Sequence, residues 1–174
     1  DSGNVFRSFD GGVTWGNYPL GSGMLRSAVA RNSFVGIVGD AGAYYRSTNN
    51  GESFSFQTLA FGTNLRTIAF ASDSIGWIGG NYGTLLKTTD AGASWTTLPA
   101  PTGQHIYCIR FSSTSLGWLV GGGGTIMQTI NGGSSWTPYN VPGLAKDLYS
   151  IDVSGSTLYV VGAEATAAKS TTGG

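Results

Sequence analysis

The sequence of 174 residues has few of the residues that build the commonest metal and catalytic sites. It has one cysteine, Cys108, and one histidine, His105. A single cysteine excludes an internal disulfide framework and a multi-cysteine metal site, and a single histidine excludes a zinc centre with several histidine ligands. We therefore expect no metal and no other cofactor. Glutamate is also rare, because Glu52 and Glu164 are the only two.

Charged residues are scarce as well, at 10% of the chain against about 25% in an average globular domain. Lys and Arg together number 9, as do Asp and Glu, so the net charge is +0. This balance gives no electrostatic footprint for nucleic acid. No apolar run approaches the roughly 20 residues of a transmembrane helix. No basic-then-apolar signal segment is present, so we expect any export signal to lie outside this sequence.

Glycine, in contrast, is abundant, with 29 residues, and it recurs at fixed intervals. Five segments share a polar turn around a glycine, and in the first four an aromatic residue follows three positions later. These segments are Arg7–Trp15, Arg46–Phe54, Lys87–Trp95, Gln128–Trp136 and the start of a fifth, Lys169–Gly174. Their anchoring glycines are spaced by 39, 41, 41 and 41 residues: Gly12, Gly51, Gly92, Gly133 and Gly174. The chain is therefore an internal repeat.

Each period holds four short apolar runs bounded by turn residues, which is typical of strands. No segment shows a sustained helical period, so we expect essentially no helix. Four strands in about 41 residues indicate a blade of a β-propeller. The predicted fold is all-β, a propeller of four-stranded antiparallel blades. A β-solenoid is the competing architecture, although its coils are usually shorter.

The third period shows the expected strand order from the inside outward. Its strands are Leu65–Phe70, Gly76–Gly80, Thr84–Thr88 and Ser94–Leu98. We interpret residues 1–174 as a single propeller, partial or complete, with approximate blades at 1–20 (half), 24–59, 64–99, 105–141 and 147–174 (incomplete). The chain opens with a third and an outermost strand, Asn4–Arg7 and Val13–Tyr18, and Asn4–Arg7 would compete with Thr166–Lys169 for the same third-strand position in a closed four-blade ring. We therefore expect a piece of a larger propeller of six to eight blades, with completion by further chains as the alternative.

The glycine segments resemble the Asp-box, or BNR repeat, as in Ser8-Phe-Asp-Gly-Gly-Val-Thr-Trp15. This motif occurs in sialidases, sortilin-type receptors and xyloglucan-degrading hydrolases. Together with Gly-Trp in the second strand and Gly-Thr before the third, it resembles the propellers of the photosystem II assembly factor and of secreted bacterial surface proteins. The resemblance covers nearly the whole chain. It implies the propeller fold and says little about function.

We call these glycine segments boxes and interpret them as structural elements that stabilise the fold. Short Asx side chains accept hydrogen bonds from turn N–H groups, glycine allows a positive φ, and buried aromatic rings pack between blades. The box residues are Asp10, Gly12, Trp15; Asn49, Gly51, Phe54; Asp90, Gly92, Trp95; and Asn131, Gly133, Trp136. Asn49, Phe54, Asn131 and Thr172 depart from the Asp-box pattern. Calcium binding is the alternative, but one carboxylate per loop is far short of the 6–8 oxygens that calcium takes.

The face opposite the boxes is the candidate binding face. The second residue of each innermost strand would ring the mouth of the central channel, and these residues are Arg26, Arg66, Tyr107 and Tyr149. Arginine offers a fork for carboxylate or phosphate, and tyrosine a stacking surface with a polar tip. We predict a protein or glycan ligand there. Alternatively, these long side chains only cover the surface between blades.

The sequence does not predict an enzyme. Glycosidases need two carboxylates at one cleft, whereas Asp40, Asp147 and Glu164 are scattered over different blades. The arginine triad and Tyr–Glu pair of sialidases have no counterpart. His105 is interpreted as an ordinary loop histidine, and Cys108 as a small packed residue rather than a nucleophile.

Three functions remain open. The main hypothesis is a non-catalytic binding or adhesion module, secreted or at the cell surface (extracellular or periplasmic), because charge is low and disulfides are lacking. A second is an assembly or structural subunit, either a scaffold similar to the photosystem II assembly factor or a self-associating ring or filament subunit. A third is a fragment of a sialidase-like glycoside hydrolase.

Overall fold

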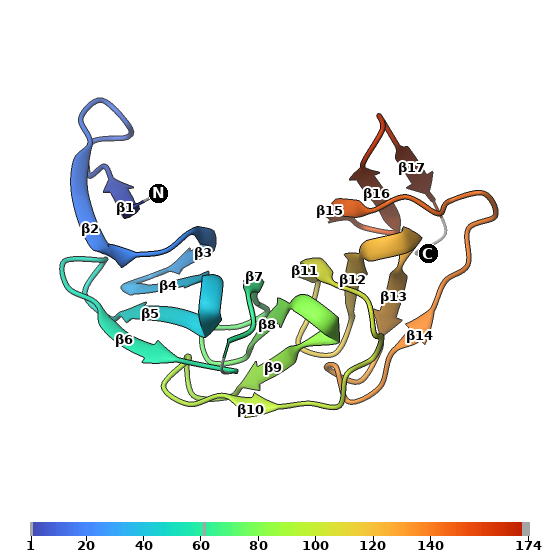
Figure 1. The fold of residues 1–174 in the computed structure, drawn as a ribbon, viewed down its shortest axis with the longest axis horizontal. Coiled ribbons are helices and arrows are strands. Elements are labelled where there is room, and N and C mark those ends of the chain that lie inside the picture. Colours follow the sequence, from blue (N-terminus) through green and yellow to red (C-terminus); the bar gives the residue numbers. More distant parts are fainter. Residues whose placement is uncertain (1, 61, 172–174) are drawn as a thin grey trace.

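The computed structural model describes residues 2–60 and 62–171. Within them the chain forms five antiparallel sheets, arranged side by side along an arc around a common centre (Figure 1). The first sheet has two strands, the next three have four each, and the last has three. The all-β propeller prediction is therefore confirmed. The end sheets stand apart at the opening of the arc (Figure 1).

The strands follow one another from the inside of each blade outward. The first sheet is β1 Ser2–Arg7 and β2 Gly16–Ser22; the second is β3 Leu25–Arg31, β4 Phe34–Gly39, β5 Ala43–Ser47 and β6 Ser55–Thr58. The third is β7 Leu65–Phe70, β8 Gly76–Gly80, β9 Leu85–Thr88 and β10 Thr96–Thr97. The fourth is β11 Ile106–Phe111, β12 Gly117–Gly121, β13 Ile126–Thr129 and β14 Thr137–Pro138. The last is β15 Leu148–Ser154, β16 Thr157–Gly162 and β17 Ala167–Ser170.

Two details differ from the sequence prediction. The outer strand of the first piece was expected at Val13–Tyr18, but β2 starts at Gly16 and continues to Ser22. It starts late because the box turn holds the residues before it, and it ends late because β1 pairs with it as far as Ser2↔Ser22. The outermost strand β10 is likewise reduced to Thr96–Thr97. The fifth box segment begins at Lys169, and its residues 172–174 lie outside the described residues.

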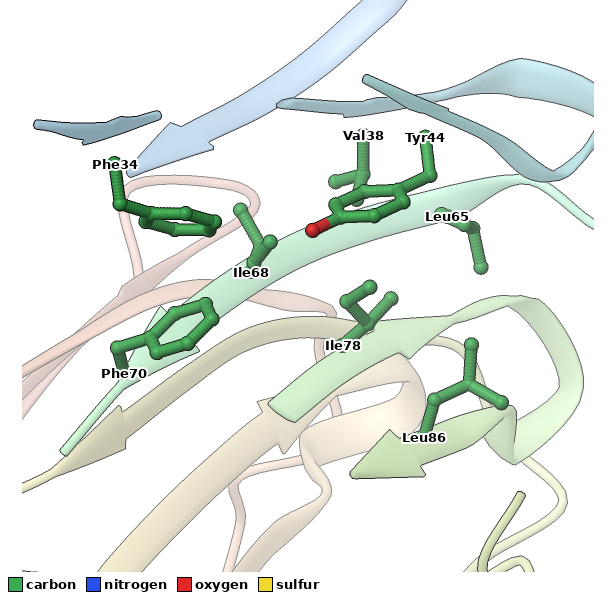
Figure 2. Packing of buried hydrophobic residues seen from close by; sticks show 8 residues of the cluster. All are labelled: Phe34, Val38, Tyr44, Leu65, Ile68, Phe70, Ile78 and Leu86. Atoms are coloured by element: carbon green, nitrogen blue, oxygen red, sulfur yellow. The ribbon is translucent and has the colours of Figure 1, made fainter. Parts of the chain in front are cut away.

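The hydrophobic core lies between neighbouring blades rather than within one. Phe34, Val38 and Tyr44 of the second sheet meet Leu65, Ile68, Phe70, Ile78 and Leu86 of the third, and all are buried (Figure 2). Equivalent clusters join the third to the fourth sheet and the fourth to the last. The third and fourth sheets are thus covered on both faces, which explains why their strands read as continuous apolar runs instead of alternating ones.

The inner strands lie beside one another and are joined by side chains. Ser27 Oγ accepts the N–H of Ile68 on the next inner strand at 3.4 Å, and Thr67 Oγ1 accepts that of Ile109 at 3.3 Å. Cys108 occupies the same position on the next inner strand, where it is a buried free cysteine. Its Sγ lies 4.0 Å from the carbonyl oxygen of Ile151.

The box loops are closed by one repeated set of hydrogen bonds. In the third period Asp90 Oδ1 accepts the N–H of Ser94 at 2.9 Å and the hydroxyl of Thr88 at 2.7 Å, while Asp90 Oδ2 accepts the hydroxyl of Ser94 at 2.6 Å. These hydrogen bonds stabilise the carboxylate, with that of the Ser94 hydroxyl foremost, and lower the pKa of Asp90 to about 2. The Thr14 hydroxyl and N–H likewise hold the pKa of Asp10 far below its usual range.

Asparagine replaces aspartate in two boxes without changing the loop. Asn131 Oδ1 accepts the N–H of Ser135 at 2.9 Å, as Asp90 does for Ser94. The amide Nδ2 then donates to the Ser135 hydroxyl at 2.8 Å, where Asp90 would accept. The hydroxyl only reverses its role, because serine can donate or accept. Asn49 makes the same pair of bonds with Ser53.

The box aromatic residues differ in burial. Trp95 packs edge-on against Tyr44 of the neighbouring blade and Phe70 of its own blade, with ring centroids at 5.5 and 6.1 Å. Trp136 packs against the next core cluster in the same way. The expectation that Trp15 is buried is wrong, since 61% of its surface is exposed. Its Nε1 donates to the carbonyl oxygen of Gly12 within its own loop, at 3.0 Å.

Three short 3-10 turns, absent from the sequence prediction, join the second and third strands of the complete blades. They are η1 Asp40–Gly42, η2 Asn81–Gly83 and η3 Gly122–Gly124. Each ends on a glycine with positive φ, and a Cβ there would lie within 1.9, 1.8 and 2.0 Å of the carbonyl oxygens of Leu59, Thr102 and Leu144 respectively. Glycine is therefore required where the turn meets the loop that enters the next blade.

Candidate binding site at the mouth of the arc

The four residues predicted to ring the channel mouth, which we call the column residues, line one hollow. Arg26, Arg66, Tyr107 and Tyr149 surround a depression of about 320 Å³, together with Met24 and Leu25. The structure therefore brings these four side chains together. Their role in ligand binding stays a prediction.

A repeated β-bulge places all four side chains. The register between β3 and β4, the two inner strands of the second sheet, shifts between Leu25 and Ser27. The same register shift recurs between the two inner strands of each of the next three sheets. The residue skipped in each case is the column residue: Arg26, Arg66, Tyr107 or Tyr149. A bulged residue leaves the regular alternation of the strand, and bulges re-aim side chains beside functional sites.

The two arginines differ in their partners. Arg26 Nε forms a salt bridge with the Asp40 carboxylate, the first residue of η1. Arg66 Nε instead donates to Asn81 Oδ1, the first residue of η2. The amide is neutral, so the charge of Arg66 is not balanced by a salt bridge among the described residues. The Arg66 guanidinium lies over the Tyr107 ring, with 4.8 Å from Cζ to the centroid.

Tyr107, one of the residues that line the hollow, is held by Asp147. Its hydroxyl donates to Asp147 Oδ2 at 3.1 Å, and Asp147 Oδ1 accepts the N–H of Gly123 at 2.9 Å. Burial, followed by the hydrogen bond to the Asp147 carboxylate, raises the pKa of Tyr107. Tyr149 meets Tyr107 edge-on at 5.3 Å and is 52% exposed.

Sequence reasoning missed two residues beside the hollow. The ring of Tyr82, on η2, lies 4.9 Å from that of His105, which in turn lies 6.0 Å from that of Tyr107. His105 Nδ1 accepts the backbone N–H of Tyr82 at 3.1 Å. His105 is thus not an isolated loop residue. We call Tyr82, His105, Tyr107 and Tyr149 the aromatic strip.

The carboxylates of this face are engaged in separate contacts. Asp40 pairs with Arg26, Asp147 holds Tyr107, and Glu164 pairs with Lys146 at 2.8 Å. Among the described residues no group of three or more His, Cys, Asp or Glu is placed to hold a metal ion. The same part of the chain has no helix with the length and hydropathy needed to cross a membrane.

A larger hollow, of about 460 Å³, lies between the first two sheets. Its lining is mainly apolar and includes Val5, Phe6, Ala28, Ala30 and Ile37. Ala28 and Ala30 belong to β3, whose residues on this side face the two-stranded sheet β1–β2 instead of a full blade. It resembles the space between blades rather than a shaped polar site.

The repeated four-stranded sheets, the box loops and the bulged column define a β-propeller built from Asp-box (BNR) repeats. The chain belongs to the family described as photosynthesis system II assembly factor YCF48, whose sequence profile matches residues 88–174. A comparison with curated proteins found no match.

Solved structures agree on the fold. YCF48 from Cyanidioschyzon merolae superposes with a TM-score of 0.75 at 17% identity, over 97% of this chain and 63% of that one. A structure titled "YCF48 bound to D1 peptide" gives 0.67 at 19% identity, over 81% and 47%. An ancestral GH74 enzyme gives 0.74 at 23% identity, over 88% and 23%. The chain thus spans less than two thirds of the length of each of these proteins.

Membership of this family corrects the predicted location. A secreted or cell-surface protein was expected, but the family is that of an assembly factor for photosystem II. The composition misled because low charge and a lack of disulfides occur in proteins of many compartments. The family therefore favours the alternative hypothesis, an assembly or scaffold subunit, over the main hypothesis of a secreted adhesion module.

Proposed function

We propose that this chain is a protein-binding scaffold of the assembly-factor type, and that the hollow around Arg66 binds an acidic peptide segment. The observation that carries the proposal is the unbalanced charge of Arg66. Its Nε is held by the neutral Asn81, and its plane is supported by Tyr107. A guanidinium held in this way presents its two terminal nitrogens as a fork, which matches a carboxylate.

The class of ligand is supported by the comparison. One similar structure contains YCF48 with a D1 peptide bound, so a propeller of this fold can take a peptide. A carboxylate on the peptide would supply the negative charge that Arg66 lacks, with Tyr149 exposed beside it for packing. A neutral glycan would leave that charge without a partner, so the peptide is the better match.

We infer that the chain acts by binding and not by catalysis. Catalysis by two carboxylates requires both to face one cleft. Here Asp40 forms a salt bridge with Arg26, and Asp147 accepts a hydrogen bond from the Tyr107 hydroxyl. The two carboxylates therefore serve to orient the side chains of Arg26 and Tyr107. The fold itself is shared with GH74 enzymes, and the inference therefore rests on these side chains.

Titration calorimetry with a short acidic peptide tests the proposal. We expect Arg66→Gln to weaken binding about 10-fold or more, as loss of a charge-assisted contact does. Arg26→Gln should cost less, because Asp40 already neutralises Arg26. The matched control is Arg110→Gln, which removes an exposed arginine from the far end of β11. Equal affinity in the wild type and Arg66→Gln would refute the proposed site.

A further inference from the structure

Tyr82 occupies a backbone position that suits other residues better. It is the middle residue of η2 and has φ 54° and ψ 38°, in the left-handed region. The equivalent residues of η1 and η3 are Ala41, with φ 55°, and Gly123, with φ 60°. A bulky residue in this region is an outlier, and such outliers gather at ligand-binding and active sites.

The surrounding turn fixes the Tyr82 backbone firmly. Its N–H donates to His105 Nδ1 at 3.1 Å. The preceding residue, Asn81, holds Arg66, and the following residue, Gly83, packs against Thr102. The backbone of Tyr82 is thereby coupled to the arginine that we assign to carboxylate binding.

The Tyr82 side chain contributes little to the fold. It is 72% exposed. Among the described residues its ring meets one other ring, that of His105, edge-on with a centroid distance of 4.9 Å. A mostly exposed ring gains little from burial. The fold therefore does not explain an aromatic residue at this position.

We propose that Tyr82 determines specificity by binding an aromatic side chain of the peptide, next to the carboxylate that Arg66 holds. This rests on the proposed function. Edge-on contacts place Tyr82, His105 and Tyr107 in a row that leads to Arg66. A peptide with an aromatic residue beside an acidic one would cover this part of the aromatic strip, because aromatic rings pair favourably edge-on or offset.

The test uses two hexapeptides that differ at one position, a Phe or an Ala next to the same Glu. Titration calorimetry on the wild-type chain should give about 3- to 10-fold tighter binding of the Phe peptide. Tyr82→Gly should lose this preference, so that it binds the Phe and Ala peptides with about equal affinity. Tyr82→Phe should retain the preference, because the ring remains.

The backbone effect is controlled by Ala41→Gly, which makes the same left-handed position a glycine in η1 without removing an aromatic ring. We expect unchanged peptide preference in this variant. Tyr82→Gly should also melt no lower than the wild type, since glycine adopts positive φ readily. A melting temperature well below that of the wild type would show that Tyr82 supports the fold, and would overturn the inference.

The outcomes separate the two proposals. If the wild type binds both peptides equally, or if Tyr82→Gly keeps the preference, the inference is wrong and the binding role of Arg66 stands. If neither peptide binds the wild type, the proposed function fails and the role of Tyr82 fails with it. An Arg66→Gln variant that binds both peptides weakly but still prefers Phe would support the role of Tyr82.

Discussion

Lys87 reaches from one blade to the next, where its Nζ lies 2.9 Å from the carbonyl oxygen of Gly132. Trp77, paired with Lys87 across β8 and β9, donates its Nε1 to the same oxygen at 3.2 Å. Arg46 makes the equivalent bond to Ala91, and Arg7 to Asn50, at 3.0 and 3.1 Å. A cation on the third strand thus anchors the box loop of the following blade.

This contact predicts a measurable loss of stability. Lys87→Met keeps most of the apolar stem and removes the charged donor. We expect the free energy of unfolding to fall by about 1–2 kcal/mol, as for a hydrogen bond from a charged group. Lys146→Met is the control, because its exposed pair with Glu164 contributes about 0–1 kcal/mol. Urea titrations of both variants giving equal losses would contradict this role.

The box tryptophans provide a matched comparison. Trp95→Ala removes a ring packed on Tyr44 and Phe70, and we expect a loss of about 3 kcal/mol or more in the free energy of unfolding. Trp15→Ala removes the exposed counterpart, and we expect a loss of about 1 kcal/mol or less. Similar thermal midpoints for the two variants would show that burial does not set the contribution of the box aromatic.

The box carboxylates predict sensitivity to acid. The folded-state pKa values of Asp10 and Asp90 lie below the unfolded value of about 3.9. Their stabilising effect is therefore complete above pH 4 and is lost as the pH falls towards 2. The double variant Asp10→Asn/Asp90→Asn should show a smaller drop in melting temperature between pH 4 and pH 2 than the wild type.

Near pH 7 this double variant should remain folded, because Asn49 and Asn131 already close their loops through the amide. Asp152→Asn, which removes an exposed carboxylate outside the boxes, serves as the control and should retain the acid dependence of the wild type. An identical drop in melting temperature for all three proteins would argue against the box carboxylates as its source.

The 3-10 turns predict a sharp difference between two glycines. Gly83→Ala would place a Cβ 1.8 Å from the Thr102 carbonyl oxygen at a φ of +72°. We expect a loss of about 2 kcal/mol or more, because backbone must move. Gly103→Ala lies nearby with open space around its Cβ and should change stability little. Circular dichroism melts of the two variants provide the measurement.

Local chemistry explains why so much of the fold follows from the sequence. The repeated glycines, Asx residues and apolar runs specify each blade by short-range rules, so the positions of β7 and β8 could be predicted to the residue. The exposure of Trp15 could not be predicted, because it depends on which sheet packs beside its loop rather than on the box itself.

The candidate site was predicted in part. Alignment of the inner strands brought Arg26 and Arg66 to equivalent positions, and the structure places both at the hollow. Their partners escaped prediction, because Asp40 and Asn81 belong to turns whose shape follows from a glycine two residues later. Alignment of those turns would have revealed Tyr82 opposite Ala41 and Gly123.

The glycines at the ends of η1, η2 and η3 have a consequence for how such a protein changes over time. Because Gly42, Gly83 and Gly124 fix the turn, the exposed residue before each of them differs among the blades, as Ala41, Tyr82 and Gly123, within the limits of the left-handed region. Each complete blade thus has one exposed turn position that lies outside the core clusters. We expect that substitutions at positions 41, 82 and 123 by residues that tolerate a positive φ would change the surface that a partner meets and leave the blades intact.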